Sequence, residues 1–380
     1  MKALYYNANP DNRIRAAKGE HSMARVLFGI MGDAQGHLNR AMALAGRLPG
    51  HEFLFVGGGR VLGLRPDHRV LEVPVPGTFY SRNRVDLRAT VLNGFRVLRR
   101  YRSTIQRLLP AVEAFDPDLV LSDYELFSQG TARILEVPCI SVSPQHAVTR
   151  CRPPFRRRQT FSRLLLALPL LALYSRADRY LVPSFGPLIP VDPETTEPFP
   201  PVLSPAVRKV APTDGSHVLV YQTSPTFKRL LPVLEVLGRR ILVYGFGHRS
   251  ETGNIRFKGP SKDAFLRDLA SCRYAVTNGG LNAISEALFL GKPVLSFPIR
   301  GAYEQLANAQ MLRHLEYGDC SLNPAPGVDR FRRFEERIGR FRSRLSGRVF
   351  DGTDRMAQRL EEIIERLASR SRRPNRGRTA

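Results

Sequence analysis

The residues best suited to acid–base chemistry stand near the start of the chain, in the segment Asp33–His37 (DAQGH). An apolar run over 24–31 precedes them and apolar residues at helical spacing follow from Leu38, a pattern that predicts a strand, a turn and a helix. Gly36 and His37 then lie at the carboxyl edge of a parallel sheet, where open α/β folds bind ligands. A histidine there could act as a general base because its ordinary pKa is near neutral. A polar residue at a helix start, without a catalytic role, is the alternative.

A carboxylate ends a second apolar strand, Leu119–Asp123. Because strands of one parallel sheet point their ends at the same crevice, Asp123 could accept a hydrogen bond from His37 and fix its tautomer. A helix cap or a loop acid is the alternative. Asp116 and Asp118 form a DxD string, but they precede the strand and so fall at the opposite edge of the sheet. Their position favours a turn over a metal site.

The longest candidate block for phosphate binding runs from Thr277 to Pro293. Two glycines follow a strand and a helix begins after them, so backbone N–H groups and the helix dipole could hold a diphosphate. Glu286 lies about two turns into that helix, closer to a ribose than to the phosphates. A structural Gly-Gly turn is the alternative, since neither a Walker A string nor GxGxxG occurs. The candidate donor-binding residues of this block are Asn278, Gly279, Gly280, Asn282, Ala283 and Glu286.

Two further segments add polar groups at strand ends of the second half. Glu304 and Gln305 follow the strand after the glycine block. Thr223 and Ser224 follow the first strand of this half and could cap a helix predicted over 226–237 while contacting a diphosphate. The capping role alone explains them as well.

Two α/β units are needed to position these candidates. In the first half, strands are predicted at 24–31, 51–56, 118–123, 139–143 and 179–183. In the second half, strands are predicted at 217–221, 240–244, 254–257, 274–277 and 293–298. A proline-dense stretch between them predicts a linker over 185–213. This order predicts an α/β fold with two parallel, Rossmann-like sheets. The predicted organisation is an N-terminal extension over 1–22, domains over 23–205 and 206–350, a helix over 351–368 and a basic tail without regular structure over 369–380.

The composition excludes a wholly disordered chain, since 43% of the 380 residues are hydrophobic and 24% are charged. Lysine and arginine number 58 against 34 acidic residues, a net charge of +24. Such a surplus favours an anionic partner: nucleic acid, an anionic membrane or a phosphorylated substrate. A basic nucleic-acid-binding protein is the less favoured class, because no recognised module accompanies the charge. The four cysteines form no CxxC pair, which argues against a zinc site and suits a reducing cytosol.

A basic segment followed by an apolar run could lie on an anionic membrane surface. Arg152, 156–158 and Arg163 come before the apolar run 164–173. This run is about half as long as the ~20 residues that span a bilayer, so it favours a helix lying on the membrane. A core or acceptor-pocket helix with a solvated basic flank is the alternative.

These motifs resemble GT-B glycosyltransferases, the superfamily of UDP-glucuronosyl-type, plant-type and MurG-like enzymes. Ala34–His37 (AQGH) is similar to a plant-type segment whose histidine is the catalytic base, and Asp123 falls where that histidine finds its acidic partner. The resemblance runs from about Ala24 to Gly318 and extends to a bacterial and archaeal branch of glycosyltransferases that carries a Thr-Asn-Gly-Gly string. It implies two Rossmann-like domains whose sheets face a central cleft.

In the second half the resemblance extends to four residues of the donor-binding region. Asn282 matches an Asn of the donor-sugar signature, and Glu286 matches its ribose-binding Glu. Glu304 and Gln305 match the acid–Gln pair that holds the sugar hydroxyls. These roles place the nucleotide sugar in the second domain, facing His37.

Two departures concern the recognition of the donor. Asn278 stands where many members have a phosphate-binding His, and Leu281 stands where plant enzymes have Trp. The resemblance implies an inverting transferase without metal or other cofactor, which moves a sugar from a nucleotide-diphosphate sugar, UDP-sugar foremost, to an acceptor hydroxyl. MurG-like relatives use lipid-linked acceptors, so the resemblance implies a lipid-linked or cell-envelope acceptor. The implied location is the cytoplasm, at the inner face of the plasma membrane if the acceptor is of that kind. A nucleotide-sugar epimerase or hydrolase on the same fold is the alternative.

Overall fold

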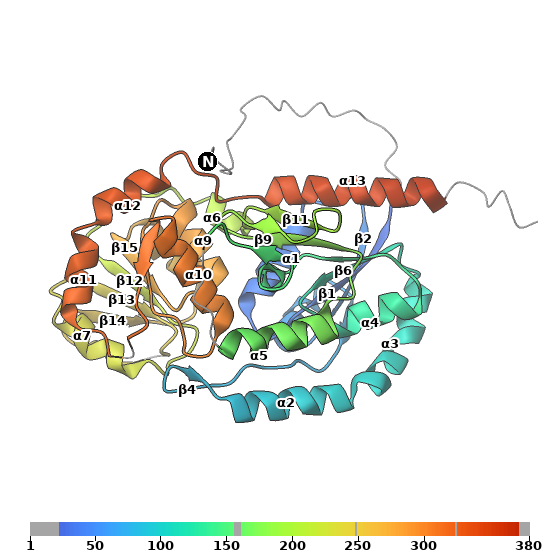
Figure 1. Ribbon diagram of the computed structural model, residues 1–380, viewed down its shortest axis with the longest axis horizontal. Helices are drawn as coiled ribbons and strands as arrows, with labels where there is room; N and C mark the ends of the chain where they lie inside the picture. The colour runs from blue at the N-terminus through green and yellow to red at the C-terminus, as the bar shows by residue number, and fades with distance from the viewer. Residues whose placement is uncertain (1–22, 156–160, 248, 324, 372–380) are drawn as a thin grey trace, which may run out of the picture.

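The computed structural model describes residues 23–155, 161–247, 249–323 and 325–371, so the predicted extension over 1–22 lies outside them. Within these ranges the chain forms two parallel sheets, each flanked by helices (Figure 1). The predicted α/β fold with two Rossmann-like domains is confirmed.

The first domain holds a seven-stranded sheet in the order β11-β9-β7-β6-β1-β2-β3, and every neighbouring pair runs parallel. β1 (Arg25–Ile30) lies inside this sheet. Val26 and Phe28 pack into the core on one face of the sheet, and Leu27 packs into the core on the other face. This follows because successive side chains of a strand point to opposite faces. The other strands are β2 (Glu52–Gly57), β3 (Val70–Glu72), β6 (Leu119–Asp123), β7 (Cys139–Ser141), β9 (Arg179–Pro183) and β11 (Thr196–Phe199).

Helices connect and cover these strands. α1 (Gln35–Ala45) follows β1, so the helix predicted from Leu38 begins at Gln35 and ends at Ala45, before Pro49. The other helices of this domain are α2 (Leu87–Arg99), α3 (Tyr101–Phe115), α4 (Leu126–Ile134) and α5 (Phe161–Pro169). Shorter elements are the helical turns η1 (Gly59–Leu64), η2 (Pro144–Ala147) and η3 (Leu170–Tyr174), and the strands β4 (Tyr80–Ser81), β5 (Arg84–Val85), β8 (Cys151–Arg152) and β10 (Ile189–Pro190).

The second domain holds a six-stranded parallel sheet in the order β14-β13-β12-β15-β16-β17. Its strands are β12 (Val218–Tyr221), β13 (Ile241–Tyr244), β14 (Ile255–Lys258), β15 (Tyr274–Thr277), β16 (Val294–Ser296) and β17 (Gly318–Cys320). Its helices are η4 (Lys228–Leu230), α7 (Leu231–Glu235), α8 (Lys262–Ala270), α9 (Leu281–Phe289), α10 (Tyr303–His314), α11 (Val328–Glu335) and α12 (Ile338–Leu345).

Two segments outside the predicted strands belong to the first domain. β11 adds an edge strand beside β9, and α6 (Pro205–Arg208) follows it, so the stretch 185–213 is not a plain linker. α13 (Thr353–Ser371) returns to the first domain and packs Met356 and Leu360 into its core (Figure 1). The predicted tail therefore begins later than residue 369, and 372–380 lie outside the described residues.

One apolar cluster joins the two domains. Phe185 and Leu188 of the first domain share it with Leu281 and Met311 of the second. A cavity lined by residues of both domains, among them Pro144 and Glu304, lies beside this cluster. The carboxyl edges of the two sheets consequently meet close to the segment that carries His37.

Candidate active site

His37 lies in the first turn of α1, the helix that follows the interior strand β1 of the first domain. Its side chain is buried, and its Nδ1 lies 2.8 Å from Oδ1 of Asp123. Asp123 ends β6, the neighbour of β1, and stands opposite Ile30 in the register. Adjacent strand ends thus bring together the two residues that the sequence proposed as a pair. With Nδ1–H donated to the carboxylate, Nε2 is the nitrogen left to accept a proton.

Arg40 is a site residue that the sequence reasoning missed. It follows His37 by three positions and therefore lies on the same face of α1. Its guanidinium donates from Nε to Oδ2 of Asp123 and from Nη2 to Oδ1, both at 2.8 Å. Both side chains are buried. The spacing of Arg40 from His37 was the signal that could have identified it.

Arg40 keeps the buried carboxyl of Asp123 ionised. Burial alone raises the pKa of Asp123, but the charges of Arg40 and His37 and the hydrogen bonds from both outweigh it and hold the pKa below its usual value. Asp123 is therefore a fixed carboxylate that faces His37. A fixed negative charge orients the imidazole and stabilises an imidazolium.

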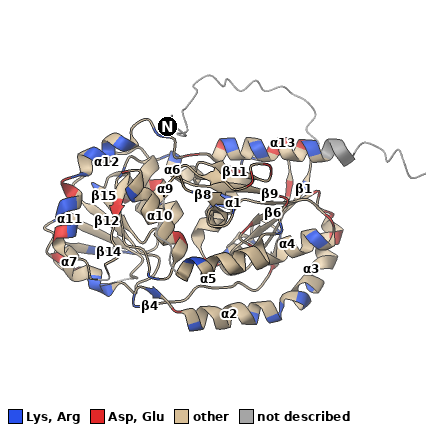
Figure 2. Ribbon diagram, viewed as in Figure 1, with Lys and Arg blue, Asp and Glu red and all other residues tan. Residues whose placement is uncertain are grey.

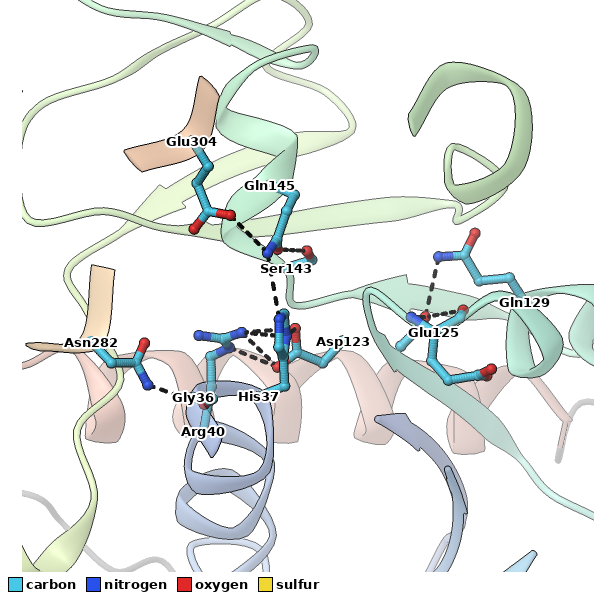
Figure 3. A network of polar contacts seen from close by, with 11 residues as sticks. Gly36, His37, Arg40, Asp123, Glu125, Gln129, Ser143, Gln145, Asn282 and Glu304 are labelled. Atoms are coloured by element: carbon cyan, nitrogen blue, oxygen red, sulfur yellow. Dashed lines mark hydrogen bonds and ion pairs between the residues drawn. The ribbon is translucent and has the colours of Figure 1, made fainter. Parts of the chain in front are cut away.

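The Nε2 side of His37 faces an amide and an acid from two different domains (Figure 3). Nε2 of Gln145, on η2, lies 3.5 Å from Nε2 of His37 and donates to Oε2 of Glu304 at 3.1 Å. Ser143 donates to Oε1 of Gln145 at 2.6 Å and fixes the amide. Burial raises the pKa of Glu304, although His37 and Arg40 oppose the shift. Gln145 was missed because only the contact between domains reveals it.

Asn282 makes a second contact between the domains. Its Nδ2 donates to the backbone oxygen of Gly36 at 3.1 Å, as Figure 3 shows. A Cβ on Gly36 would lie 2.8 Å from this nitrogen, so the close approach favours glycine. The first turn of α1 and the start of α9 therefore face each other.

The glycine pair lies between β15 and α9, as predicted. Gly279 has φ +89, which favours glycine, and a Cβ there would lie 2.7 Å from the backbone oxygen of Gln305. Gly280 is the N-cap residue directly before α9, and a Cβ there would meet open space. The first N–H groups of α9 have no partner within the helix. Ala283 is buried in the first turn of α9. Asn278 donates to Oγ1 of Thr223 at 2.5 Å.

Glu286 occupies the second turn of α9 and is buried. Burial raises its pKa to about 7, and the positive charge of Lys262 opposes the shift. Burial and, to a lesser degree, the charge of Glu286 raise the pKa of Tyr221. A carboxyl that titrates near neutral pH is typical of a binding or catalytic site.

The predicted capping role of Thr223 and Ser224 is wrong. The helix begins at Lys228, as η4 and then α7, and neither has a side-chain cap. Ser224 donates to Oγ1 of Thr226 at 3.2 Å instead. Phe227 is buried against Phe297 and delays the start of the helix.

Glu304 and Gln305 lie in the first turn of α10. Oε1 of Gln305 accepts a hydrogen bond from the backbone of Ile299 at 3.0 Å, so this amide also holds the loop after β16. Asp116 and Asp118 instead contact Arg25 at the opposite edge of the first sheet. Within the described ranges, no three His, Cys, Asp or Glu side chains gather as metal ligands would.

Comparison with known proteins identifies relatives over most of the chain. The family model for glycosyl transferase family 1 matches residues 24–334. An uncharacterized glycosyltransferase of Methanosarcina mazei is 24% identical over 342 residues, which cover 77% of this chain and 84% of the relative. Another from Methanosarcina acetivorans is 24% identical over 390 residues, which cover 91% of this chain and 100% of the relative.

Solved structures of glycosyltransferases share the fold. The calicheamicin glycosyltransferase CalG4 superposes with a TM-score of 0.61 at 17% identity, covering 91% of this chain and 100% of that one. SsfS6 from Streptomyces sp. SF2575, solved in complex with thymidine diphosphate, superposes with a TM-score of 0.55 at 17% identity, covering 89% and 99%. At such identity the likeness shows the arrangement of the chain rather than its substrates.

Proposed function

The chain belongs to glycosyl transferase family 1 and has the fold of a GT-B glycosyltransferase, and from this premise we propose that it transfers a sugar with inversion, using His37 as the base. The donor is a nucleotide-diphosphate sugar and the acceptor carries a hydroxyl. The observation that supports this proposal is the buried contact of His37 with Asp123 on a face that meets Glu304 of the second domain.

The proton and the electron pair each have a defined path in this reaction. Nε2 of His37 takes the hydroxyl proton of the acceptor while the acceptor oxygen attacks the anomeric carbon. The bond from that carbon to the phosphate oxygen breaks on the opposite face, which inverts the configuration. Asp123 stabilises the imidazolium that forms, and Arg40 keeps Asp123 charged.

The leaving diphosphate gains its stabilisation from the second domain. Gly280 precedes α9, a helix of 9 residues whose free N–H groups and dipole favour negative charge. Thr223 and Asn278 lie beside this point. These groups supply the role that a divalent metal plays in other transferases, so the proposed reaction uses no metal.

The donor base is proposed to be uracil, because the sequence resembles UDP-glucuronosyl-type enzymes, with thymine as the nearest rival. SsfS6 was solved with thymidine diphosphate, and it shares the fold of this chain. A thermal-shift screen with UDP-, GDP- and dTDP-sugars tests the proposal, because a ligand of the folded state raises the melting temperature. No shift with any nucleotide sugar would contradict a donor site.

The acceptor is proposed to be lipid-linked or otherwise part of the cell envelope. α5 and α2 lie on the side of the first domain opposite α13 (Figure 1). Both helices expose large apolar side chains: Phe161, Leu164, Leu168 and Leu171 around α5, and Leu87, Val91, Leu92, Phe95 and Leu98 on α2. Ala167 and Leu170 of the same segment are buried, so the segment is also part of the core.

The basic residues 156–158 lie outside the described residues. None of the helices in the described residues is long and apolar enough to cross a membrane.

Product analysis separates transfer from epimerisation and hydrolysis. Incubation with a donor and candidate acceptors is expected to yield a glycoside, whose anomeric proton coupling in NMR reports inversion. Free sugar or an epimerised nucleotide sugar as the sole product would favour the rival reactions. A glycoside of retained configuration would contradict the inverting mechanism.

The affinity for the donor is expected to rise with pH as Glu286 ionises. Its carboxylate accepts hydrogen bonds from ribose hydroxyls, and burial raises its pKa to about 7. Binding should therefore weaken by up to roughly tenfold for each pH unit below that value. Calorimetric titration of the nucleoside diphosphate across this range measures the effect. The affinity of the Glu286→Gln variant should lack this pH dependence, because an amide does not titrate. An identical pH dependence in both proteins would contradict the ribose-binding role of Glu286.

A further inference from the structure

A hairpin of the first domain extends to the second domain. β4 and β5 pair antiparallel, and Arg82 and Asn83 form the turn between them with φ values of 50 and 56. Such positive φ values are those of a type I′ turn, which suits a tight hairpin. Figure 2 shows β4 at the border of the second domain, with lysine and arginine segments around it.

Two backbone–backbone hydrogen bonds and one bond to a side-chain hydroxyl fix this hairpin to the second domain. Val85 donates to the backbone oxygen of Arg300 at 2.8 Å, and Arg300 donates to that of Asn83 at 3.0 Å. The backbone N–H of Asn83 donates to Oγ1 of Thr226 at 3.1 Å. The hairpin is therefore held by the loops that follow β16 and β12, at the carboxyl edge of the second sheet.

A cavity of about 750 Å³ opens between the hairpin and these loops. Five basic residues from both domains line it: Arg82, Arg84, Lys228, Arg229 and Arg300. Asp86 is the single acidic residue of its lining, and its carboxylate caps α2 by accepting from the backbone of Ala89 at 3.0 Å. Across the described ranges, none of the five basic side chains has a hydrogen bond or an ion pair. Five positive charges against the single carboxylate of Asp86 leave the lining of this cavity with a net positive charge, which favours an anionic ligand.

The cavity is separate from the glycine pair. Phe227 lines the cavity and belongs, with Phe297, to the core on one face of the second sheet. Leu281 and Ile284 of α9 belong to the core on the other face. The start of α9, proposed to hold the donor diphosphate, therefore lies on the opposite side of the sheet edge.

The base of the hairpin lies next to the turn that carries His37. Oδ2 of Asp33 accepts a hydrogen bond from the backbone of Thr78 at 3.0 Å, just before β4. At the other end, a Cβ on Gly301 would lie 3.4 Å from Cβ of Val85, and α10 with Glu304 begins shortly after Gly301. The hairpin thus lies between the turn that precedes His37 and the loop that precedes Glu304.

We propose that this basic cavity binds a phosphate group carried by the acceptor, so that the substrate class is a phosphorylated alcohol or glycan. The inference rests on the proposed transferase function. Guanidinium groups suit this ligand, because they bind phosphate oxygens through paired, charge-assisted hydrogen bonds. Bound there, the phosphate anchors the acceptor while its hydroxyl lies at His37.

Calorimetric titration with inorganic pyrophosphate tests the cavity once the donor site is filled with nucleoside diphosphate. The protein should bind pyrophosphate under these conditions, and more weakly as salt rises. Arg82→Gln combined with Arg84→Gln should weaken this binding by about 10- to 100-fold, because two charge-assisted contacts are lost. The affinity for the nucleoside diphosphate should not change. Arg102→Gln with Arg133→Gln, which removes the same charge from exposed positions on α3 and α4, should leave both affinities unchanged.

Two results would overturn the proposal. One is the absence of pyrophosphate binding when the nucleoside diphosphate is already bound. The other is an equal loss of affinity for the nucleoside diphosphate in the hairpin variant (Arg82→Gln with Arg84→Gln), which would assign these cations to the donor site. If no nucleoside diphosphate binds at all, the proposed function fails, and pyrophosphate binding to the free protein still tests the cavity.

Two further arms distinguish the source of the phosphate. Vesicles of phosphatidylcholine with phosphatidic acid, but not pure phosphatidylcholine, should sediment the wild type better than the hairpin variant if the phosphate is a lipid headgroup. Glycerol 3-phosphate should compete with pyrophosphate if the phosphate belongs to a soluble acceptor.

Discussion

Replacing His37 by alanine is expected to lower the rate of sugar transfer by about 10²- to 10⁴-fold, the usual contribution of a general base. The imidazole is buried, Asp123 holds its Nδ1, and its Nε2 faces the junction with the second domain. Its loss leaves the acceptor hydroxyl without a group to take its proton. Steady-state kinetics with the donor identified by thermal shift measures the effect, which should fall on kcat rather than on KM.

The matched control for this variant is another histidine of the first domain. His68 is exposed and its ring meets the edge of Phe55, away from the site. His68→Ala should therefore keep the rate within about twofold, as expected of most surface substitutions. Full activity of the His37 variant would remove His37 from the role of base. A raised KM with unchanged kcat would reassign it to substrate binding.

The pairing of His37 with Asp123 could be predicted because it depends on backbone topology. Each residue follows a buried strand, and neighbouring parallel strands place such positions at one edge. The same reasoning located the glycine pair before α9. Both depend on where strands end along the chain, which the hydrophobic pattern of the sequence displays, and on the strands belonging to one parallel sheet.

Contacts made by packing between elements could not be predicted in this way. Gln145 meets Glu304 only because η2 and α10 come from different domains that pack together. β11 was hidden in a proline-dense stretch, since an edge strand tolerates proline where its N–H groups face outward. The helix expected from 226 begins later because burial of Phe227 outweighs local propensity.

Replacing Asp123 by alanine is expected to reduce both turnover and stability. Arg40 would keep a buried guanidinium without its carboxylate, at a cost of about 3–5 kcal/mol in the free energy of unfolding. Turnover should fall by about 10²- to 10⁴-fold, because the imidazole loses its orienting partner. Urea denaturation and steady-state kinetics measure the two effects separately. A stable variant with normal turnover would contradict both roles of the carboxylate.

The double variant with Arg40→Met distinguishes chemistry from stability. Replacing both members of a buried ion pair by apolar residues often restores stability, so unfolding should return to within about 1–2 kcal/mol of the wild type. Turnover should stay low, because His37 still has no carboxylate. The ion pair of Arg359 with Glu197, which joins α13 to β11, provides the control. Glu197→Ala with Arg359→Met should alter stability alone. If turnover recovered together with stability in the Asp123 double variant, the carboxylate would only hold the fold, and His37 would act without it.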